Sequence, residues 1–151
     1  MNTPVAAEPP KDLIGFLDFY LVKKAPIQVP EGGREWIVKV GPWITIVLLI
    51  LTLPLLLVAF GIGAVYVPFG GVGYATGFGV LTIFVIVEIG LMIAALPGLF
   101  ARTMAGWRLL FYSQLVGIVH SVLSGNIVGG LLFGLIGLYI LFQVRTLYRE
   151  S

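Results

Sequence analysis

The sequence contains no cysteine and few charged residues. The absence of cysteine excludes disulfides, thiolate metal sites and cysteine nucleophiles. Charged residues make up 11% of the 151 residues and hydrophobic residues 59%, whereas about one quarter of a typical globular domain is charged. So few charges cannot cover the surface of a water-soluble core, and so high a hydrophobicity excludes a disordered chain. The composition therefore predicts an integral membrane protein.

The basic residues do not indicate nucleic-acid binding. The formal net charge is only +2, and the lysines and arginines are not clustered in one recognition element. They flank apolar segments, where membrane orientation explains them. We therefore expect the chain to interact with the lipid bilayer and not with nucleic acid.

Four apolar segments are long enough, or nearly so, to cross a bilayer as helices, which takes about 20 residues. The predicted spans are residues 42–67, 78–96, 109–124 and 127–144. Pro54 lies near the centre of the first span and removes one helical hydrogen bond, which predicts a kink there. The sequence thus predicts an all-α integral membrane protein, whose residues 42–151 form a small bundle of four transmembrane helices.

The segments between the spans are short and rich in glycine or proline. We expect a turn at residues 30–36, an uncharged loop at 67–77 and a link at 99–108. Gly125 and Asn126 both tolerate positive φ, which predicts a tight turn between the last two spans.

Residues 1–41 form the predicted N-terminal segment, and residues 11–24 within it have the pattern of an amphipathic helix. The stretch is too short and too charged to cross a bilayer, so we expect an interfacial helix that lies in the membrane plane. Its apolar face consists of Leu13, Ile14, Phe16, Leu17, Tyr20 and Leu21.

All nine lysines and arginines fall on one side of this four-span arrangement. Five precede the first span, two lie in the 99–108 link and two follow the fourth span. The positive-inside rule makes that side the cytoplasm, so we expect a multi-pass protein of the cell (inner) membrane with both termini cytoplasmic. Trp43 and Trp107 lie at the inner ends of spans, where aromatic belts occur.

Glu88 is the only acidic residue within any predicted span, and it lies near the middle of the second. An ionised carboxylate at that depth is costly and by default marks a functional site. His120, in the third span, is the one intramembrane candidate for its partner, at a depth that differs by about 5 Å at 1.5 Å per residue. The alternatives are a structural acid that is protonated or paired, and a contact with a partner protein.

The polar residues of the third span share one face, which we expect to point into the bundle because polar groups avoid hydrocarbon. This face either joins helices through hydrogen bonds, each worth about 0.6 kcal/mol, or lines a hydrated path or ligand cavity. The candidate intramembrane proton or ion site consists of Glu88, His120, Ser113, Gln114 and Ser124.

Gly130, Gly134 and Gly137 share one face of the fourth span. Such a smooth face lets another helix approach closely. We predict helix packing at these glycines and at Pro54, either within one chain or between two copies of it.

The functional hypotheses follow from these few polar groups. One histidine and one intramembrane glutamate are too few for a metal site with three or four ligands, and no acid is placed in the sequence to orient His120 as the base of a serine nucleophile. We therefore expect no metal, no cofactor and no enzymatic activity. The leading hypothesis is a non-enzymatic accessory or structural subunit of a larger membrane assembly, with other membrane subunits or further copies as partners. The alternative is a small oligomeric proton- or cation-coupled transporter or channel that uses Glu88 and His120.

Overall fold

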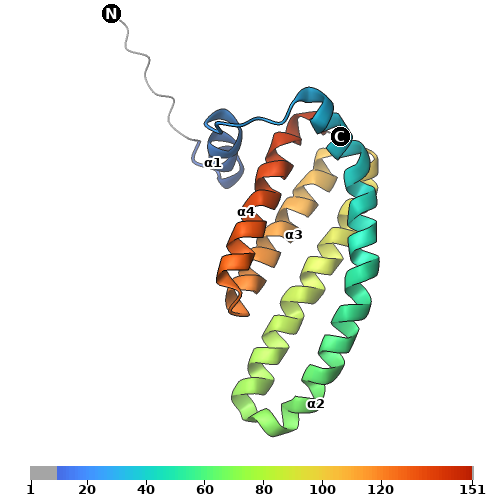
Figure 1. Ribbon diagram of the computed structural model, residues 1–151, viewed down its shortest axis with the longest axis vertical. Coiled ribbons are helices and arrows are strands. Elements are labelled where there is room, and N and C mark those ends of the chain that lie inside the picture. Colours follow the sequence, from blue (N-terminus) through green and yellow to red (C-terminus); the bar gives the residue numbers. More distant parts are fainter. Residues whose placement is uncertain (1–9, 151) are drawn as a thin grey trace, which may run out of the picture.

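The computed structural model describes residues 10–150, and this part of the chain is all-helical, as predicted (Figure 1). An isolated β-bridge between Thr103 and Arg149 is present, and the described residues contain no strand. Residues 1–9, the start of the predicted N-terminal segment, lie outside the described residues. The elements are α1 (Leu13–Asp18), a π-helix (Phe19–Lys23), α2 (Glu31–Phe100), α3 (Met104–Leu123), α4 (Ile127–Gln143) and a 3-10 helix (Arg145–Leu147).

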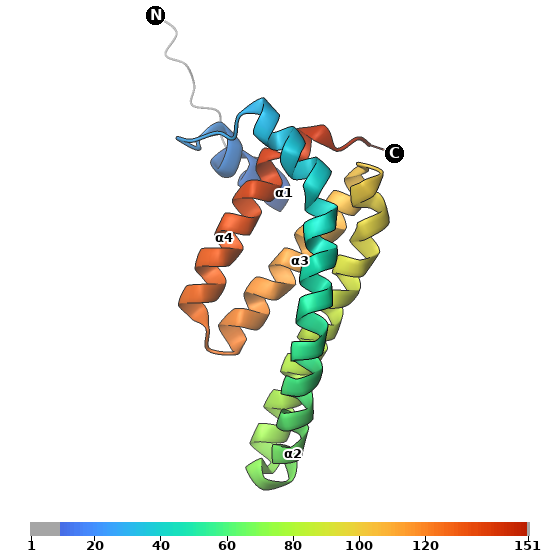
Figure 2. The same cartoon turned by 45° about the vertical axis from the view of Figure 1, so that its right-hand side comes forward.

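Helix α2 is a hairpin of two arms, residues 31–70 and 72–100, that reverses direction at Gly71. Gly71 has φ 70° and ψ −175° and is the one residue of α2 with non-helical dihedrals. A side chain would be strained at such a positive φ, which glycine adopts freely. The arms run side by side in both views (Figures 1 and 2), and near the tip the hydroxyl of Tyr74 donates to the carbonyl of Gly63 at 3.3 Å.

The expected loop at residues 67–77 is therefore wrong, because the helix continues on both sides of Gly71. Glycine weakens a helix, yet of the four glycines in this segment only Gly71 departs from helical dihedrals. The expected turn at residues 30–36 is wrong as well, since α2 begins at Glu31 directly after Pro30. Pro54 is exposed within the first arm, and helical dihedrals continue through it.

The core lies at the end of the bundle where α2 ends, α3 begins and α4 ends; we call this the terminal end. Trp107, Phe111 and Phe142 are fully buried there. The Trp107 ring stacks on Phe111 at 5.6 Å and meets Phe142 edge-on at 5.1 Å, and its Nε1 donates to the carbonyl of Leu141 at 2.9 Å. The prediction that Trp107 lies in an interfacial aromatic belt is thus wrong, because its ring is a centre of the core. Trp43 is 61% exposed.

Two glycines let the end of α2 and the start of α3 touch through their backbones. A Cβ atom built at Gly106 would lie 2.3 Å from the carbonyl carbon of Gly98. The Thr103 side chain caps α3 by accepting from the amide of Gly106 at 3.4 Å. This close approach fixes the second arm of α2 beside α3.

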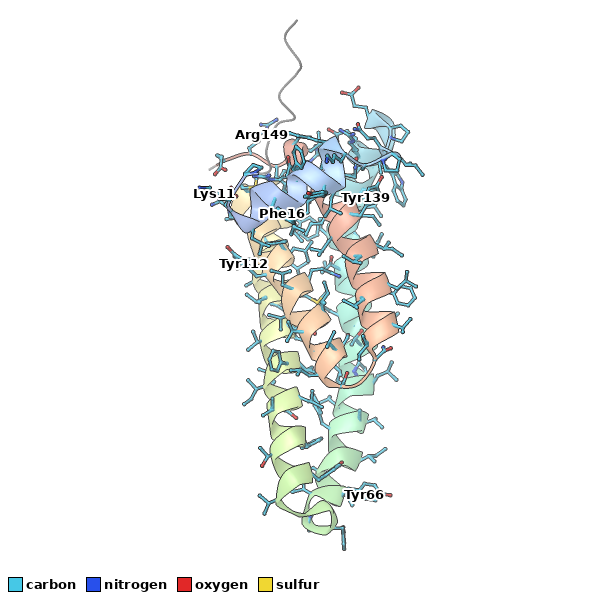
Figure 3. The ribbon with its side chains drawn as sticks, turned by 90° about the vertical axis from the view of Figure 1, so that its left-hand side faces the viewer. Lys11, Phe16, Tyr66, Tyr112, Tyr139 and Arg149 are labelled. Atoms are coloured by element: carbon cyan, nitrogen blue, oxygen red, sulfur yellow. The ribbon has the colours of Figure 1, made fainter. Side chains whose placement is uncertain are left out.

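Within residues 10–150, the charged residues other than Glu88 gather at the terminal end. Three ion pairs join separate elements there: Arg102 with Glu35 at 2.9 Å, Arg108 with Glu150 at 3.2 Å, and Arg145 with Asp18 at 3.3 Å. Figure 3 shows Lys11 and Arg149 at this end and Tyr66 at the opposite one, the hairpin tip.

Where the sequence predicted an amphipathic helix over residues 11–24, the structure has α1 followed directly by the π-helix. Together they pack across the terminal end. Ile14, Leu17 and Leu21 contact the core, whereas Leu13 and Phe16 remain 54% and 43% exposed. The apolar face is therefore divided between the bundle and the surroundings.

Helix α2 is the one element of the described chain that is long and apolar enough to cross a membrane by length and composition, and α4 is apolar but shorter, with 17 residues. The arms of α2 extend well past the turn between α3 and α4 (Figures 1 and 2). At 1.5 Å per residue, the second arm is about 43 Å long and α3 about 30 Å.

Candidate functional site

Glu88 lies on the second arm of α2, on the side that faces α3. It is the only charged residue between Lys39 and Arg102 in the sequence. Its side chain is 30% exposed, and the neighbouring Val85 is buried. The carboxyl group thus lies at the edge of the packed helices, where it meets an opening.

His120 of α3 faces Glu88, with its Nδ1 atom 4.0 Å from the carboxylate Oε2. This separation is too long for a direct hydrogen bond, and among residues 10–150 neither side chain donates or accepts one. Gly117, one turn before His120, makes room for the carboxylate, because a Cβ atom there would lie 2.7 Å from Oε1. The carboxyl and imidazole groups are therefore neighbours that share a common space.

The other polar residues of α3 divide between its two neighbours. The Ser113 hydroxyl donates to the backbone carbonyl of Glu88 at 3.3 Å, which sets the register of α3 against α2. Gln114 points the other way, and its Nε2 donates to the carbonyl of Gly134 on α4 at 3.5 Å. Ser124 is exposed and donates to the carbonyl of Ser121 in its own helix at 3.0 Å, so it does not join Glu88.

The glycines of α4 face α3 within the same chain. A Cβ atom at Gly130 would lie 2.3 Å from the Cβ of Ser121, and one at Gly134 would lie 2.3 Å from Cγ1 of Ile118. At Gly137 it would lie 2.6 Å from Nε2 of Gln114. The glycine face thus brings α4 against the polar residues of α3.

A cavity of about 240 Å³ opens between Glu88, α3 and α4. Glu88, His120 and Gln114 line it together with Ser121 and Asn126, two polar residues that the predicted site did not include. A carboxyl and an imidazole group on one polar cavity can exchange a proton with water or hold a small cation. The described residues 10–150 contain no cluster of three or more His, Cys, Asp or Glu residues that could hold a metal ion.

Gln143 is a buried polar residue that the sequence analysis missed. Its Nε2 donates to the carbonyl of Leu21 at 2.9 Å, and its Oε1 accepts from Arg34 at 3.4 Å. It thereby ties the N-terminal segment to α4. The only signal in the sequence was an uncharged amide at the end of an otherwise apolar span.

No family model matches this sequence, and no curated protein or solved structure is significantly similar to it.

Proposed function

We propose that the chain crosses the cell (inner) membrane four times, through the two arms of α2, α3 and α4, with both termini on the cytoplasmic side. The length and apolarity of α2 support the first pair of crossings. The gathering of basic residues at the terminal end supports the orientation, since cytoplasmic loops carry the excess of lysine and arginine.

We propose that this membrane protein acts as a non-enzymatic accessory or structural subunit of a larger membrane assembly. The observation that supports this most is the length of the α2 hairpin. Helix α3 matches a hydrocarbon core of about 30 Å, and the second arm exceeds α3 by about 13 Å at 1.5 Å per residue. Val65, Phe69 and Val72 near the tip are 64%, 83% and 84% exposed. Apolar side chains held past the hydrocarbon favour a partner that covers them.

Native mass spectrometry of the protein, expressed at its natural level and extracted in mild detergent, tests this function. We expect one stoichiometric complex, whether with other subunits or with further copies. Phe69→Ser combined with Val72→Ser should dissociate it. The matched control is Leu55→Ser with Leu57→Ser, two side chains of the first arm that are each 71% exposed and that we assign to lipid. A wild-type monomer would contradict the proposal.

A second candidate function is a small oligomeric proton- or cation-coupled transporter or channel. The 4.0 Å approach of His120 to Glu88 on a polar cavity favours it. In proteoliposomes, Glu88→Gln keeps the volume of the side chain and removes its proton, so it should abolish coupled transport while the helix content stays unchanged. If Glu88→Gln transports as well as wild type, Glu88 has a structural role and the transporter proposal fails.

A further inference from the structure

Two cavities touch Glu88 and another lies beyond them toward the terminal end, and the three differ in chemistry along the bundle. The polar cavity described above extends from Glu88 to Asn126, at the turn between α3 and α4. A larger cavity of about 590 Å³ lies toward the terminal end, between the first arm of α2 and α4. A third, of about 300 Å³, lies between the two arms and also touches Glu88 and His120.

The large cavity is lined mainly by apolar side chains, among them Leu48, Met92, Leu99, Leu110 and Leu141. It shares Gln114 with the polar cavity, and Leu48 and Met92 with the third one. Every route from Glu88 to the terminal end through these cavities therefore passes apolar walls. Beyond Glu88 and His120, the one titratable residue that lines any of the three is Tyr148, at the far mouth of the large cavity.

Water enters a cavity when it finds two to four polar partners there, whereas cavities lined by leucine and similar residues stay dry. The polar cavity offers such partners in Gln114, Ser121 and Asn126. A dry apolar stretch is a barrier to ions and protons, as in channels that gate by dewetting.

We infer that Glu88 and His120 form a proton-binding site with one-sided access: water reaches it through the polar cavity from the α3–α4 turn, and the dry large cavity closes it toward the terminal end. This inference rests on the second candidate function for its physiological use. The asymmetry of access itself depends only on the cavities.

Substituted cysteines test from which side of the membrane water reaches the site. The wild-type chain has no cysteine, so a thiol reagent labels only the introduced residue. Ser121→Cys places a thiol in the polar cavity and Leu110→Cys places one in the large cavity. A charged, membrane-impermeant methanethiosulfonate is added to one side of oriented proteoliposomes, and Val72→Cys and Glu150→Cys identify the two sides. We expect Ser121→Cys to react only from the side that labels Val72→Cys, and Leu110→Cys to react from neither side.

A gain-of-leak variant tests the dry barrier. Leu110→Asn adds polar partners for water to the large cavity, and it should raise the rate at which an imposed pH gradient collapses severalfold over wild type. Adding Glu88→Gln should remove that leak. Leu57→Asn is the matched control, because this exposed residue lines none of the three cavities.

The outcomes separate this inference from the transporter. Reaction of Leu110→Cys from the terminal side, or no reaction of Ser121→Cys from the turn side, overturns one-sided access. One-sided access is also overturned if Leu110→Asn is folded, as the fluorescence of Trp107 reports, and the imposed pH gradient collapses no faster than in wild type. One-sided labelling with no coupled transport of any cation would refute the transporter and leave the access intact.

Discussion

Gly106 is the position where one added methyl group should destabilise the fold most. A Cβ atom there would lie 2.3 Å from the carbonyl carbon of Gly98 and 2.5 Å from the amide nitrogen of Leu99. Carbon atoms in contact lie about 3.5–4.0 Å apart. Because the obstructing atoms belong to the backbone, no rotamer change relieves the overlap, and α2 and α3 must separate by more than an ångström.

The magnitude follows from comparing three glycine-to-alanine changes. Overpacking typically costs about 1–3 kcal/mol, and alanine gains up to about 1 kcal/mol over glycine in a helix. Gly90→Ala meets nothing within 4 Å, so it should keep that whole gain. Gly134→Ala meets Cγ1 of Ile118 at 2.3 Å, a side-chain atom that can shift although the β-branched residue is stiff, and should be destabilising by about 1 kcal/mol. Gly106→Ala, which meets backbone atoms, should carry the upper overpacking cost and lower the free energy of unfolding by about 2 kcal/mol.

Equilibrium unfolding with sodium dodecyl sulfate in mixed micelles measures this order. The fully buried Trp107 reports unfolding by fluorescence, in a background where the exposed Trp36 and Trp43 are replaced by phenylalanine. The stability should fall in the order Gly90→Ala, Gly134→Ala, Gly106→Ala. A Gly106→Ala variant as stable as Gly90→Ala would refute the backbone contact between α2 and α3.

Three further predictions concern the ends of the molecule. An impermeant thiol reagent on intact cells should label Ser124→Cys, at the exposed end of α3, but not Ala105→Cys, and the opposite pattern would reverse the orientation. Leu17→Asp should detach the N-terminal helix and speed its proteolysis while the fluorescence of Trp107 stays unchanged; unchanged protease resistance would count against the docking of this helix. Burial raises the pKa of the Tyr148 phenol above its ordinary 10.0, and Arg102 opposes the shift, so the folded state keeps its proton longer than the unfolded state. The free energy of unfolding should therefore fall as the pH rises above about 10, Tyr148→Phe should flatten that fall across an alkaline denaturation series, and an equal slope in both proteins would disprove it.

The sequence predicted the helical class and the turn at Gly125–Asn126 because both follow from local chemistry. It also placed Glu88 and His120 at similar depths from the register of their helices, and their side chains lie 4.0 Å apart. Depth can be counted along a helix at about 1.5 Å per residue, and this is why such a relation is readable from sequence.

The errors arose where the environment overrides local preference. Four glycines at 67–77 indicated a loop, yet only Gly71 leaves the helix. Trp107 directly precedes Arg108 near the end of a predicted span, as a belt residue would, and only the packing of α3 against α4 shows that it is buried. The contact between Gly98 and Gly106 has no periodic signal, since the two glycines belong to different helices.

For the proposed membrane topology, the reversal of α2 at a single residue has a consequence for how the chain would enter a bilayer. Between Lys39 and Arg102 only Glu88 is charged, so the tip can pass through lipid without carrying a charged loop. The first arm stays helical up to Gly71 except for the hydrogen bonds that Pro42, Pro54 and Pro68 remove, and a largely hydrogen-bonded backbone enters hydrocarbon at lower cost. The hairpin can thus insert tip first as one preformed unit. On the same proposal, helices α3 and α4, joined by the short turn at Gly125–Asn126, would form a second unit that emerges later in synthesis and docks on the first where Gly106 meets Gly98.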